Sequence, residues 1–550
     1  MVFKKDGQTL CLAALSAVLL LYLASFAVIN FFGFMKFCNS DMYQDITYAM
    51  LAWRDKSFFP QGWVFGNQYY VFTTPVLCAL FYGLTSNASF SMALATTVMT
   101  GLILLSMWYL LRPFTDGVGC LVGVTAMAGC MITANAAESL EGQLFYVLAS
   151  YYAGYLITML VVIGDYSRAV CFENKRGFSL SLVLSSVLCF AAGMQSFRLT
   201  AVLILPLMAA ELLRMFTLQQ KKESEKWGRA LAVPGRVLLY EMSNLAGAVY
   251  IAALRIPQVT IYGSLGPRAL SDWKNAYAIN SRIFSKLTGF FYTQTEELSL
   301  PYYALSLLFI GVVVCAALVT LYRYISERRI GICNRKSLFG VIVIVVFGIS
   351  IVGLFAMNLL CDINFRTPYL FIWYPFTAIL CAIFVKMKNT SSWRNAAVAL
   401  LCAGFVGNWA VGYASEVQQS LEPRETSILK VVSDFVVEQG FTYVYGDLAI
   451  TGPIAAYTNG RVLAASSYGN ALEILPYINP QGVYGEAENQ NAVYVFRGRD
   501  DIEALEYAKT IDARMTLVAE YSRGYYTLYT SDKPLMHYGS MLTASTVPRQ

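Results

Sequence analysis

Two aspartates follow the first long apolar segment of the chain, within the sequence NSDMYQDITYA that begins at residue 39. If this stretch is helical, Asp41 and Asp45 are four residues apart and project from one helix face. Two carboxylates on one face can converge on a cleft and act in general acid or base catalysis. The alternative is an N-cap and a solvated first-turn acid beside a surface helix.

A second pair of acids, Glu138 and Glu141, lies in otherwise apolar surroundings about one hundred residues later. Charged groups at membrane depth cost about 2.5 to 3.5 kcal/mol on insertion scales, so they tend to face a cavity or a partner. If both acidic segments lie on the same side of the membrane, their side chains can line one pocket.

Two arginines are candidates for binding a phosphate. Arg198 lies at a turn between two apolar runs, and Arg366 precedes a late apolar run. The planar guanidinium fork suits phosphate oxygens. The alternative for each arginine is simple snorkelling of its charge to the membrane surface.

Other kinds of site are excluded or disfavoured by the residues that the chain has. His537 is the only histidine, which excludes a histidine-rich metal site and disfavours a Ser-His-Asp triad. The sequence has neither a GxxxxGK[ST] phosphate loop nor a GxGxxG motif after a strand, which argues against nucleotide hydrolysis and dinucleotide cofactors. The net charge of +6 comes from short basic loops, so it does not indicate nucleic-acid binding.

The composition indicates a membrane protein, since 57% of the residues are hydrophobic, 13% are charged and the mean hydropathy is +0.52. A transmembrane helix needs about 20 apolar residues, and we predict about eleven spans. They lie near residues 9–32, 89–111, 118–135, 144–163, 178–195, 199–216, 236–253, 301–322, 338–359, 369–385 and 395–412.

A shorter apolar run, residues 70–84, decides the predicted topology. If it lies in the membrane surface or re-enters without crossing, every basic loop falls on one side, which the positive-inside rule assigns to the cytoplasm. The N-terminus is then cytoplasmic, and residues 33–88 form one long outer loop. After residue 412 the sequence pattern predicts strands that alternate with helices. We therefore predict a membrane domain over 1–412, followed by a small extracytoplasmic α/β domain over 413–550.

In these features the chain resembles the GT-C fold glycosyltransferases that use polyprenyl-phosphate sugars, among them protein O-mannosyltransferases and the aminoarabinose transferase. Asp41 matches the acid after the first helix of those enzymes, and Asp45 is the alternative match. Glu138 or Glu141 matches their second acidic motif. Residues 67–85 look like their juxtamembrane helix, and residues 365–370 look like an Arg-Tyr-Leu-type motif. The spacing D-x-x-x-D departs from their usual Asp-Glu or D-x-D, and the absence of a Trp-Trp-Asp triplet disfavours transfer to asparagine.

The resemblance implies a polytopic α-helical membrane protein of GT-C-like fold with juxtamembrane helices. It implies an inverting transfer of a sugar from a polyprenyl-phosphate donor to a saccharide, lipid or protein acceptor outside the plasma membrane. Asp41 or Asp45 would be the general base, and Arg198 or Arg366 would stabilise the departing phosphate. A need for Mg²⁺ or Mn²⁺ stays open. The alternatives are a transporter or flippase of lipid-linked saccharides and a non-catalytic membrane scaffold.

Overall fold

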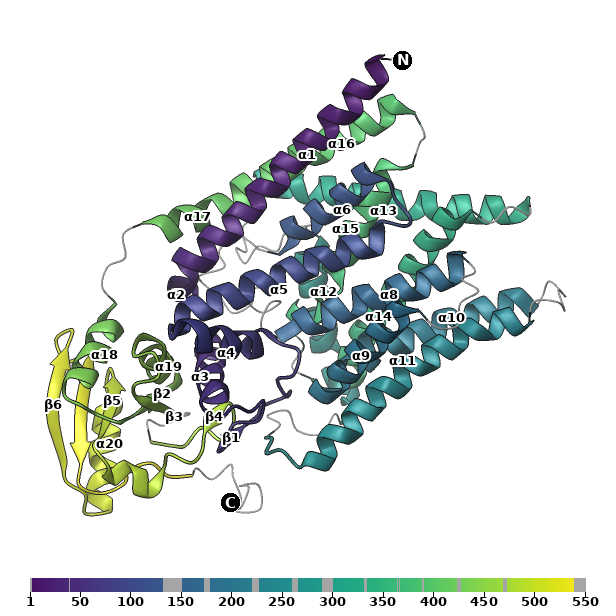
Figure 1. Ribbon diagram of the computed structural model, residues 1–550. Helices are drawn as coiled ribbons and strands as arrows, with labels where there is room; N and C mark the ends of the chain where they lie inside the picture. The colour runs from purple at the N-terminus through teal and green to yellow at the C-terminus, as the bar shows by residue number, and fades with distance from the viewer. Residues whose placement is uncertain are drawn as a thin grey trace. The chain divides into compact units, whose positions relative to one another are not determined.

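The structure is a computed structural model (Figure 1), and it describes residues 2–38, 40–131, 151–172, 179–219, 227–259, 266–288, 300–330, 334–363, 365, 367–387, 390–422, 427–467 and 472–538. The chain forms two compact units. The first comprises Met1–Gly33, Thr97–Ala253 and Tyr262–Leu421, and the second comprises Phe34–Thr96, Leu254–Ile261 and Glu422–Gln550.

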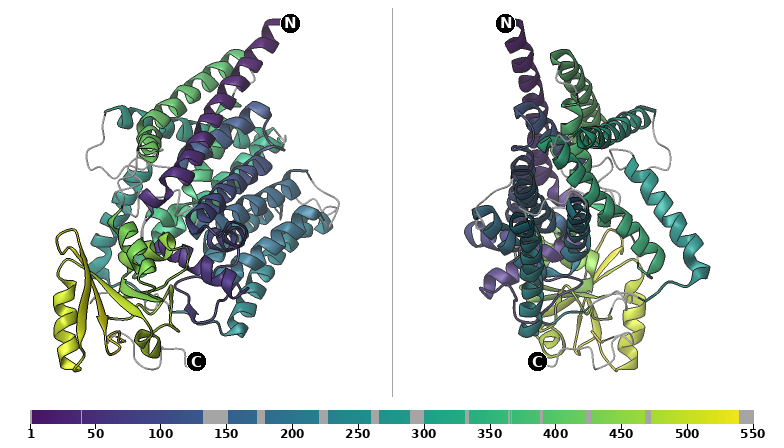
Figure 2. Two further views of the ribbon diagram at one scale, coloured as in Figure 1. Left: turned by 60° about the vertical axis from the view of Figure 1, so that its left-hand side comes forward. Right: turned by 90° about the vertical axis from the view of Figure 1, so that its right-hand side faces the viewer.

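The first unit is built of helices, most of them apolar, which Figure 2 shows from two further sides. They are α1 (Val2–Val28), α5 (Ala88–Leu111, which begins in the second unit), α6 (Gly117–Cys130), α8 (Ala153–Phe172), α9 (Leu180–Gln195), α10 (Leu205–Gln219), α11 (Trp227–Leu254), α12 (Trp273–Thr288), α13 (Leu300–Arg329), α14 (Arg335–Leu360), α15 (Trp373–Val385), α16 (Ser391–Asn408) and α17 (Ala414–Leu421). Short π-helical segments at Ile29–Gly33, Thr200–Ile204 and Trp409–Tyr413 and 3₁₀ turns at Leu270–Asp272 and Thr367–Leu370 join or extend them.

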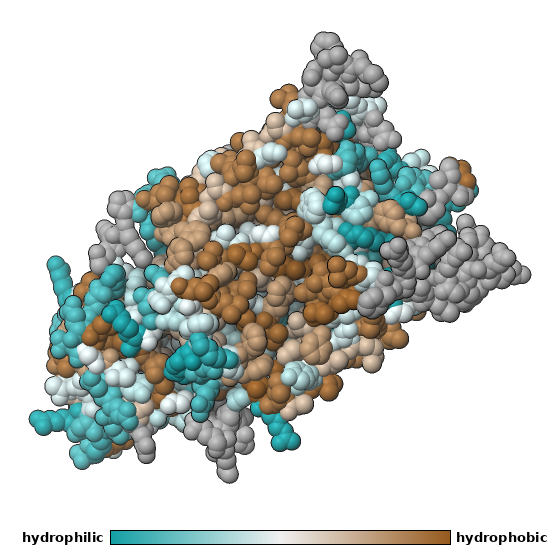
Figure 3. Space-filling model, viewed as in Figure 1, coloured by the Kyte–Doolittle hydropathy of each residue, from teal (hydrophilic) through white to brown (hydrophobic). Residues whose placement is uncertain are grey.

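The chain is a multi-pass membrane protein by the length and apolar character of these helices. Among the described residues, seven segments are long and apolar enough to cross a membrane: Thr9–Phe37, Ala88–Leu111, Ala153–Phe172, Val233–Leu254, Leu307–Arg329, Arg335–Leu360 and Ser391–Leu421. The other predicted spans also contain helices, but shorter ones. Apolar side chains cover the helices on the face drawn in Figure 3, and large ones such as Leu238, Met242 and Val249 on α11 are exposed, as lipid-facing residues are.

The run that decides the predicted topology forms a short helix, α4 (Thr74–Thr85). Pro75 lies in its first turn, where a missing N–H costs nothing, and Ser86 ends it in the left-handed conformation. At 1.5 Å per residue, its 12 residues extend only about 18 Å, and the hydrocarbon core is about 30 Å thick. This helix alone is therefore too short to cross a bilayer.

The second unit contains the segment after the first helix together with the C-terminal tail. Its helices are α2 (Phe34–Phe37), α3 (Ser40–Arg54), α4, α18 (Ile428–Glu438), α19 (Leu448–Tyr457) and α20 (Asp500–Thr510), and Gly485–Asn489 is a 3₁₀ turn. A five-stranded sheet has the order β3-β2-β5-β7-β6, with β2 (Tyr443–Asp447), β3 (Leu463–Ser467), β5 (Ala492–Arg497), β6 (Met515–Tyr521) and β7 (Tyr526–Ser531).

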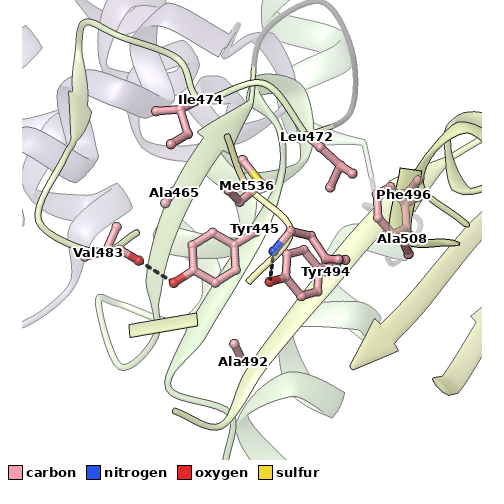
Figure 4. Close-up of a cluster of buried hydrophobic side chains, with 12 residues drawn as sticks. Tyr445, Ala465, Leu472, Ile474, Val483, Ala492, Tyr494, Phe496, Ala508 and Met536 are labelled. Carbon is pink, nitrogen blue, oxygen red and sulfur yellow. Dashed lines mark hydrogen bonds between the residues drawn. The ribbon is translucent and has the colours of Figure 1, made fainter. Parts of the chain in front are cut away.

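The sheet confirms the predicted α/β character of the tail. Strands β2, β3 and β5 are parallel, with α19 in the crossover from β2 to β3, whereas β6 and β7 form an antiparallel hairpin. One face of the sheet buries an aromatic core, in which the Tyr445 hydroxyl donates to the Val483 carbonyl and the Leu535 N–H donates to the Tyr494 hydroxyl at 3.3 Å (Figure 4). The hairpin turn at residues 522–524 has positive φ angles throughout.

Candidate functional site

Helix α3 carries both candidate aspartates, as the sequence predicts if that stretch is helical. Asp41 lies in its first turn and Arg54 in its last, so both charges complement the helix dipole. Every residue from Met42 to Ala52 is buried, which is unusual for a helix with so many polar side chains. Helix α3 is therefore an internal element of the second unit, not a surface helix.

Asp45 lies in the middle of this buried stretch and is 0% exposed. The Tyr70 hydroxyl donates a hydrogen bond to its Oδ1 at 2.8 Å. Tyr48, one turn further along α3, packs edge-on against the Tyr70 ring, with centroids 4.7 Å apart, and its own hydroxyl donates to the Phe58 carbonyl. The carboxylate of Asp45 is thus held in place by an ordered aromatic neighbour.

The charge of Asp45 acts on groups around it. Burial first, and the negative charge of Asp45 second, raise the pKa of Tyr70, of Tyr48 and of the Cys38 thiol above their usual values. Such coupling is strong only where water is largely excluded. Asp45 therefore occupies a poorly solvated position that a diffusing acceptor cannot reach without displacing protein.

Asp41 lies one turn nearer the start of α3 and is partly exposed. Since it is four residues from Asp45, it projects from the same face of the helix. A general base must come within about 3 Å of the proton that it removes, directly or through one water. Of the two aspartates, Asp41 has the exposure that this role requires.

Helix α4 packs directly on α3. A Cβ added at Gly83 would lie 2.3 Å from the indole ring of Trp53, so only glycine permits this approach. At the end of α4 the Tyr82 hydroxyl donates to the carbonyl of Asn459, and the Asn459 side chain accepts from the Ala88 N–H, both at 2.8 Å. The juxtamembrane segment is thereby bonded to the C-terminal tail.

Helix α3 also contacts the tail directly. The Gln44 amide donates to the Ser466 hydroxyl on β3 at 2.9 Å, and the Thr451 hydroxyl on α19 shares that oxygen at 2.7 Å. A Cβ at Gly452 would lie 2.5 Å from the Cβ of Tyr43, so α19 meets α3 at van der Waals distance. The tail therefore supports the helix that carries both aspartates.

A two-stranded sheet also joins the segment after the first helix to the C-terminal tail. Strand β1 (Trp63–Val64) pairs antiparallel with β4 (Asn479–Pro480). The Asn479 side chain binds the backbone N–H and carbonyl of Ser466, the same residue that bonds Gln44. Sequence reasoning missed these contacts because no local pattern marks a two-residue strand.

The other predicted site residues lie in the first unit or outside the described residues. Arg198 belongs to the first unit, where its guanidinium lies over the Tyr152 ring at 5.3 Å from the centroid and its N–H donates to Ser196. Glu138, Glu141 and Arg366 lie outside the described residues.

No metal site is evident among the residues that the structure describes, because no three His, Cys, Asp or Glu side chains there gather closely enough to hold an ion. Asp41 and Asp45 supply two carboxylates, and one oxygen of Asp45 already accepts from Tyr70. We therefore derive no step through Mg²⁺ or Mn²⁺.

Sequence reasoning also missed two buried charge networks in the helices of the first unit. Asp165 on α8 accepts from Arg236 at 2.9 Å and from Tyr240 at 2.5 Å, both on α11. On α10, Glu211 pairs with Arg214 at 2.5 Å and accepts from Tyr166. A lone acid inside an apolar run is the signal that could have revealed each, since such a charge must find a partner.

Comparisons with known proteins find matches only among solved structures. No protein-family model matches the sequence, and no curated protein does. Seven chains of solved structures match, including ArnT from Cupriavidus metallidurans bound to undecaprenyl phosphate, with 12% sequence identity, a TM-score of 0.49, and coverage of 96% of this chain and 99% of that one. A similarity at this level assigns neither family nor activity, so any function must be argued from the chain's own residues.

Proposed function

We propose that this chain is a membrane glycosyltransferase that moves a sugar from a polyprenyl-phosphate donor to an extracytoplasmic acceptor. The observation that carries the proposal is the placement of α3. This helix directly follows the first apolar helix, holds a buried carboxylate at Asp45 and presents a partly exposed one at Asp41. Its resemblance to the acidic segment of GT-C enzymes supplies the reaction class.

In the proposed reaction, Asp41 removes the proton of the acceptor hydroxyl as that oxygen attacks the anomeric carbon of the donor. The bond from the anomeric carbon to the phosphate oxygen breaks on the opposite face, so the configuration inverts and polyprenyl phosphate leaves. Arg198 or Arg366 would neutralise the charge that develops on the phosphate. No nucleotide is required, in agreement with the lack of nucleotide motifs.

Asp45 and Tyr70 have a positioning role in this proposal. Their buried hydrogen bond fixes the rotation of α3, and so the direction in which Asp41 projects. The tail contributes through Gln44 and Ser466, which fix the same helix from its other side. The α/β domain would then be part of the catalytic apparatus, on the outer side of the plasma membrane, with the N-terminus in the cytoplasm.

The test is donor consumption by the purified chain in proteoliposomes. Labelled polyprenyl-phosphate hexoses and aminopentoses are supplied with an envelope extract as the source of acceptors. A positioned general base contributes about 10² to 10⁴ in rate, so Asp41→Asn should lose about that factor. Asp434→Asn is the matched control, because Asp434 is an exposed acid of the same unit that forms an i,i+4 ion pair with Lys430. Full activity in both Asp41→Asn and Asp45→Asn would overturn the mechanism.

A further inference from the structure

The first unit contains a cavity of about 270 Å³ where three of its helix ends meet. Its wall is formed by the turn after α5, the C-terminal half of α13, the start of α14 and the end of α15. The stacked rings of Phe114 and Phe339, with centroids 4.0 Å apart, close its apolar side. The volume is just below the range of about 300 to 1,000 Å³ that encloses a drug-sized ligand, so it suits a compact group.

Three cations line this cavity: Arg323, Lys336 and Lys386. Lys386 pairs with Asp116, which Arg394 also approaches at 3.6 Å, and Arg323 donates to the Met387 carbonyl. Among the described residues, neither Arg323 nor Lys336 has a carboxylate partner.

A second carboxylate lies at the rim of the cavity. Glu327 accepts from the Asn334 amide at 3.4 Å and forms no ion pair within the described part of the chain. The three lining cations and Arg394 carry four positive charges, whereas Asp116 and Glu327 carry two negative charges. The cavity therefore has an excess of positive charge. The remaining polar lining comprises the hydroxyls of Thr115 and Thr320, which donate to the carbonyls of Leu111 and Ala316, together with the Ser337 hydroxyl and the Asn334 amide.

Apolar side chains flank Arg323 on α13. Leu318, Tyr322 and Ile325 are 61%, 71% and 52% exposed, as residues in contact with acyl chains are. The cavity lies among the loops that the positive-inside rule assigns to the cytoplasmic face. Basic pockets between transmembrane helices on that face bind the headgroups of anionic lipids.

We propose that this cavity is a binding site for a phosphate group at the basic face of the membrane, separate from the catalytic residues proposed above. Arg323 and Lys336 supply the charge, and the Ser337 hydroxyl donates a hydrogen bond to a phosphate oxygen. The exposed apolar side chains beside it favour the headgroup phosphate of an anionic phospholipid over a free phosphate ion.

Native mass spectrometry of the delipidated full chain tests this, with phosphatidylglycerol, phosphatidylcholine and inorganic phosphate as separate probes. Each cation should contribute about fivefold to affinity, so Arg323→Gln with Lys336→Gln should weaken phosphatidylglycerol binding about 25-fold. Arg329→Gln is the control, because Arg329 is an exposed cation of α13 that does not line the cavity.

The outcomes separate the sources of the phosphate. Selective loss of phosphatidylglycerol binding in the double variant, with phosphatidylcholine and the control variant unaffected, supports a lipid headgroup. Competition by inorganic phosphate at equal affinity supports a phosphate site filled from solution. Equal binding of phosphatidylglycerol by the double variant and the wild type overturns the proposal, and because the assay needs no turnover, its result is independent of the proposed glycosyl transfer.

Discussion

The buried contact between Tyr70 and Asp45 makes a sharp prediction for the variant Tyr70→Phe. The substitution removes one hydroxyl that donates to a carboxylate oxygen at 2.8 Å in a site where both residues are buried. A hydrogen bond to a charged group contributes about 1.5 to 3 kcal/mol to stability, and removal leaves the carboxylate oxygen without that donor. We expect the free energy of unfolding to fall by about that amount.

The matched control for this prediction is the neighbouring residue. The Tyr69 hydroxyl donates to the neutral Ile256 carbonyl at 3.2 Å from a half-buried position, so Tyr69→Phe should cost about 0.5 to 1.5 kcal/mol. Thermal unfolding in one detergent compares the two variants, at about 2 to 4 °C per kcal/mol for a unit of this size. Equal shifts in the two variants would refute the reasoning.

A double-mutant cycle identifies the partner. In the background Asp45→Asn, the Tyr70 hydroxyl faces a neutral amide oxygen, so Tyr70→Phe should cost less than it does in the wild type. An undiminished cost would mean that the hydroxyl stabilises the fold by a route other than Asp45. Activity should fall in Tyr70→Phe by a smaller factor than in Asp41→Asn, because a positioning residue does not touch the substrate.

Three further predictions concern the tail and the buried charges. Gly452→Val should lower transfer activity and the unfolding temperature together, because its side chain would overlap Tyr43 on α3. Burial, and then the charge of Glu488, raise the pKa of Tyr494 above its usual value of 10. The contribution of Tyr494 to stability should therefore be constant below pH 10 and fall above it by about 1.4 kcal/mol per pH unit, so Tyr494→Phe should lose less stability at high pH than the wild type in denaturation curves. Asp165→Ala should cost about 3 to 5 kcal/mol in thermal unfolding, since it leaves Arg236 buried without its carboxylate, and a stable variant would contradict this.

Much of the fold could be predicted because its signals are local. Long apolar runs specify helices by length alone, and each predicted span contains a helix in the described residues. In the tail, the predicted alternation of strands and helices is confirmed by the five-stranded sheet and by α18, α19 and α20. The hypothesis about Asp41 and Asp45 required a helix in that stretch, and α3 is that helix.

The rest depends on contacts between distant parts of the chain. Nothing in the two residues of β1 indicates that they pair with β4, more than four hundred positions later. Likewise, Gln44 and Ser466 are ordinary polar residues in their local sequence, and only the packing of α19 on α3 brings them together. Arg236 is the first residue of a predicted span, and its partner Asp165 lies 71 positions earlier on α8, so the local sequence does not reveal the buried pair.

The most direct test of the central claim is the anomeric configuration of the product. Purified chain in proteoliposomes is supplied with a polyprenyl-phosphate sugar of known configuration, and the product is examined by NMR. Our account predicts a new glycosidic bond of inverted configuration, lost in Asp41→Asn and kept in Asp434→Asn. A product of retained configuration, or movement of the intact lipid across the bilayer with no glycosidic product, would contradict it.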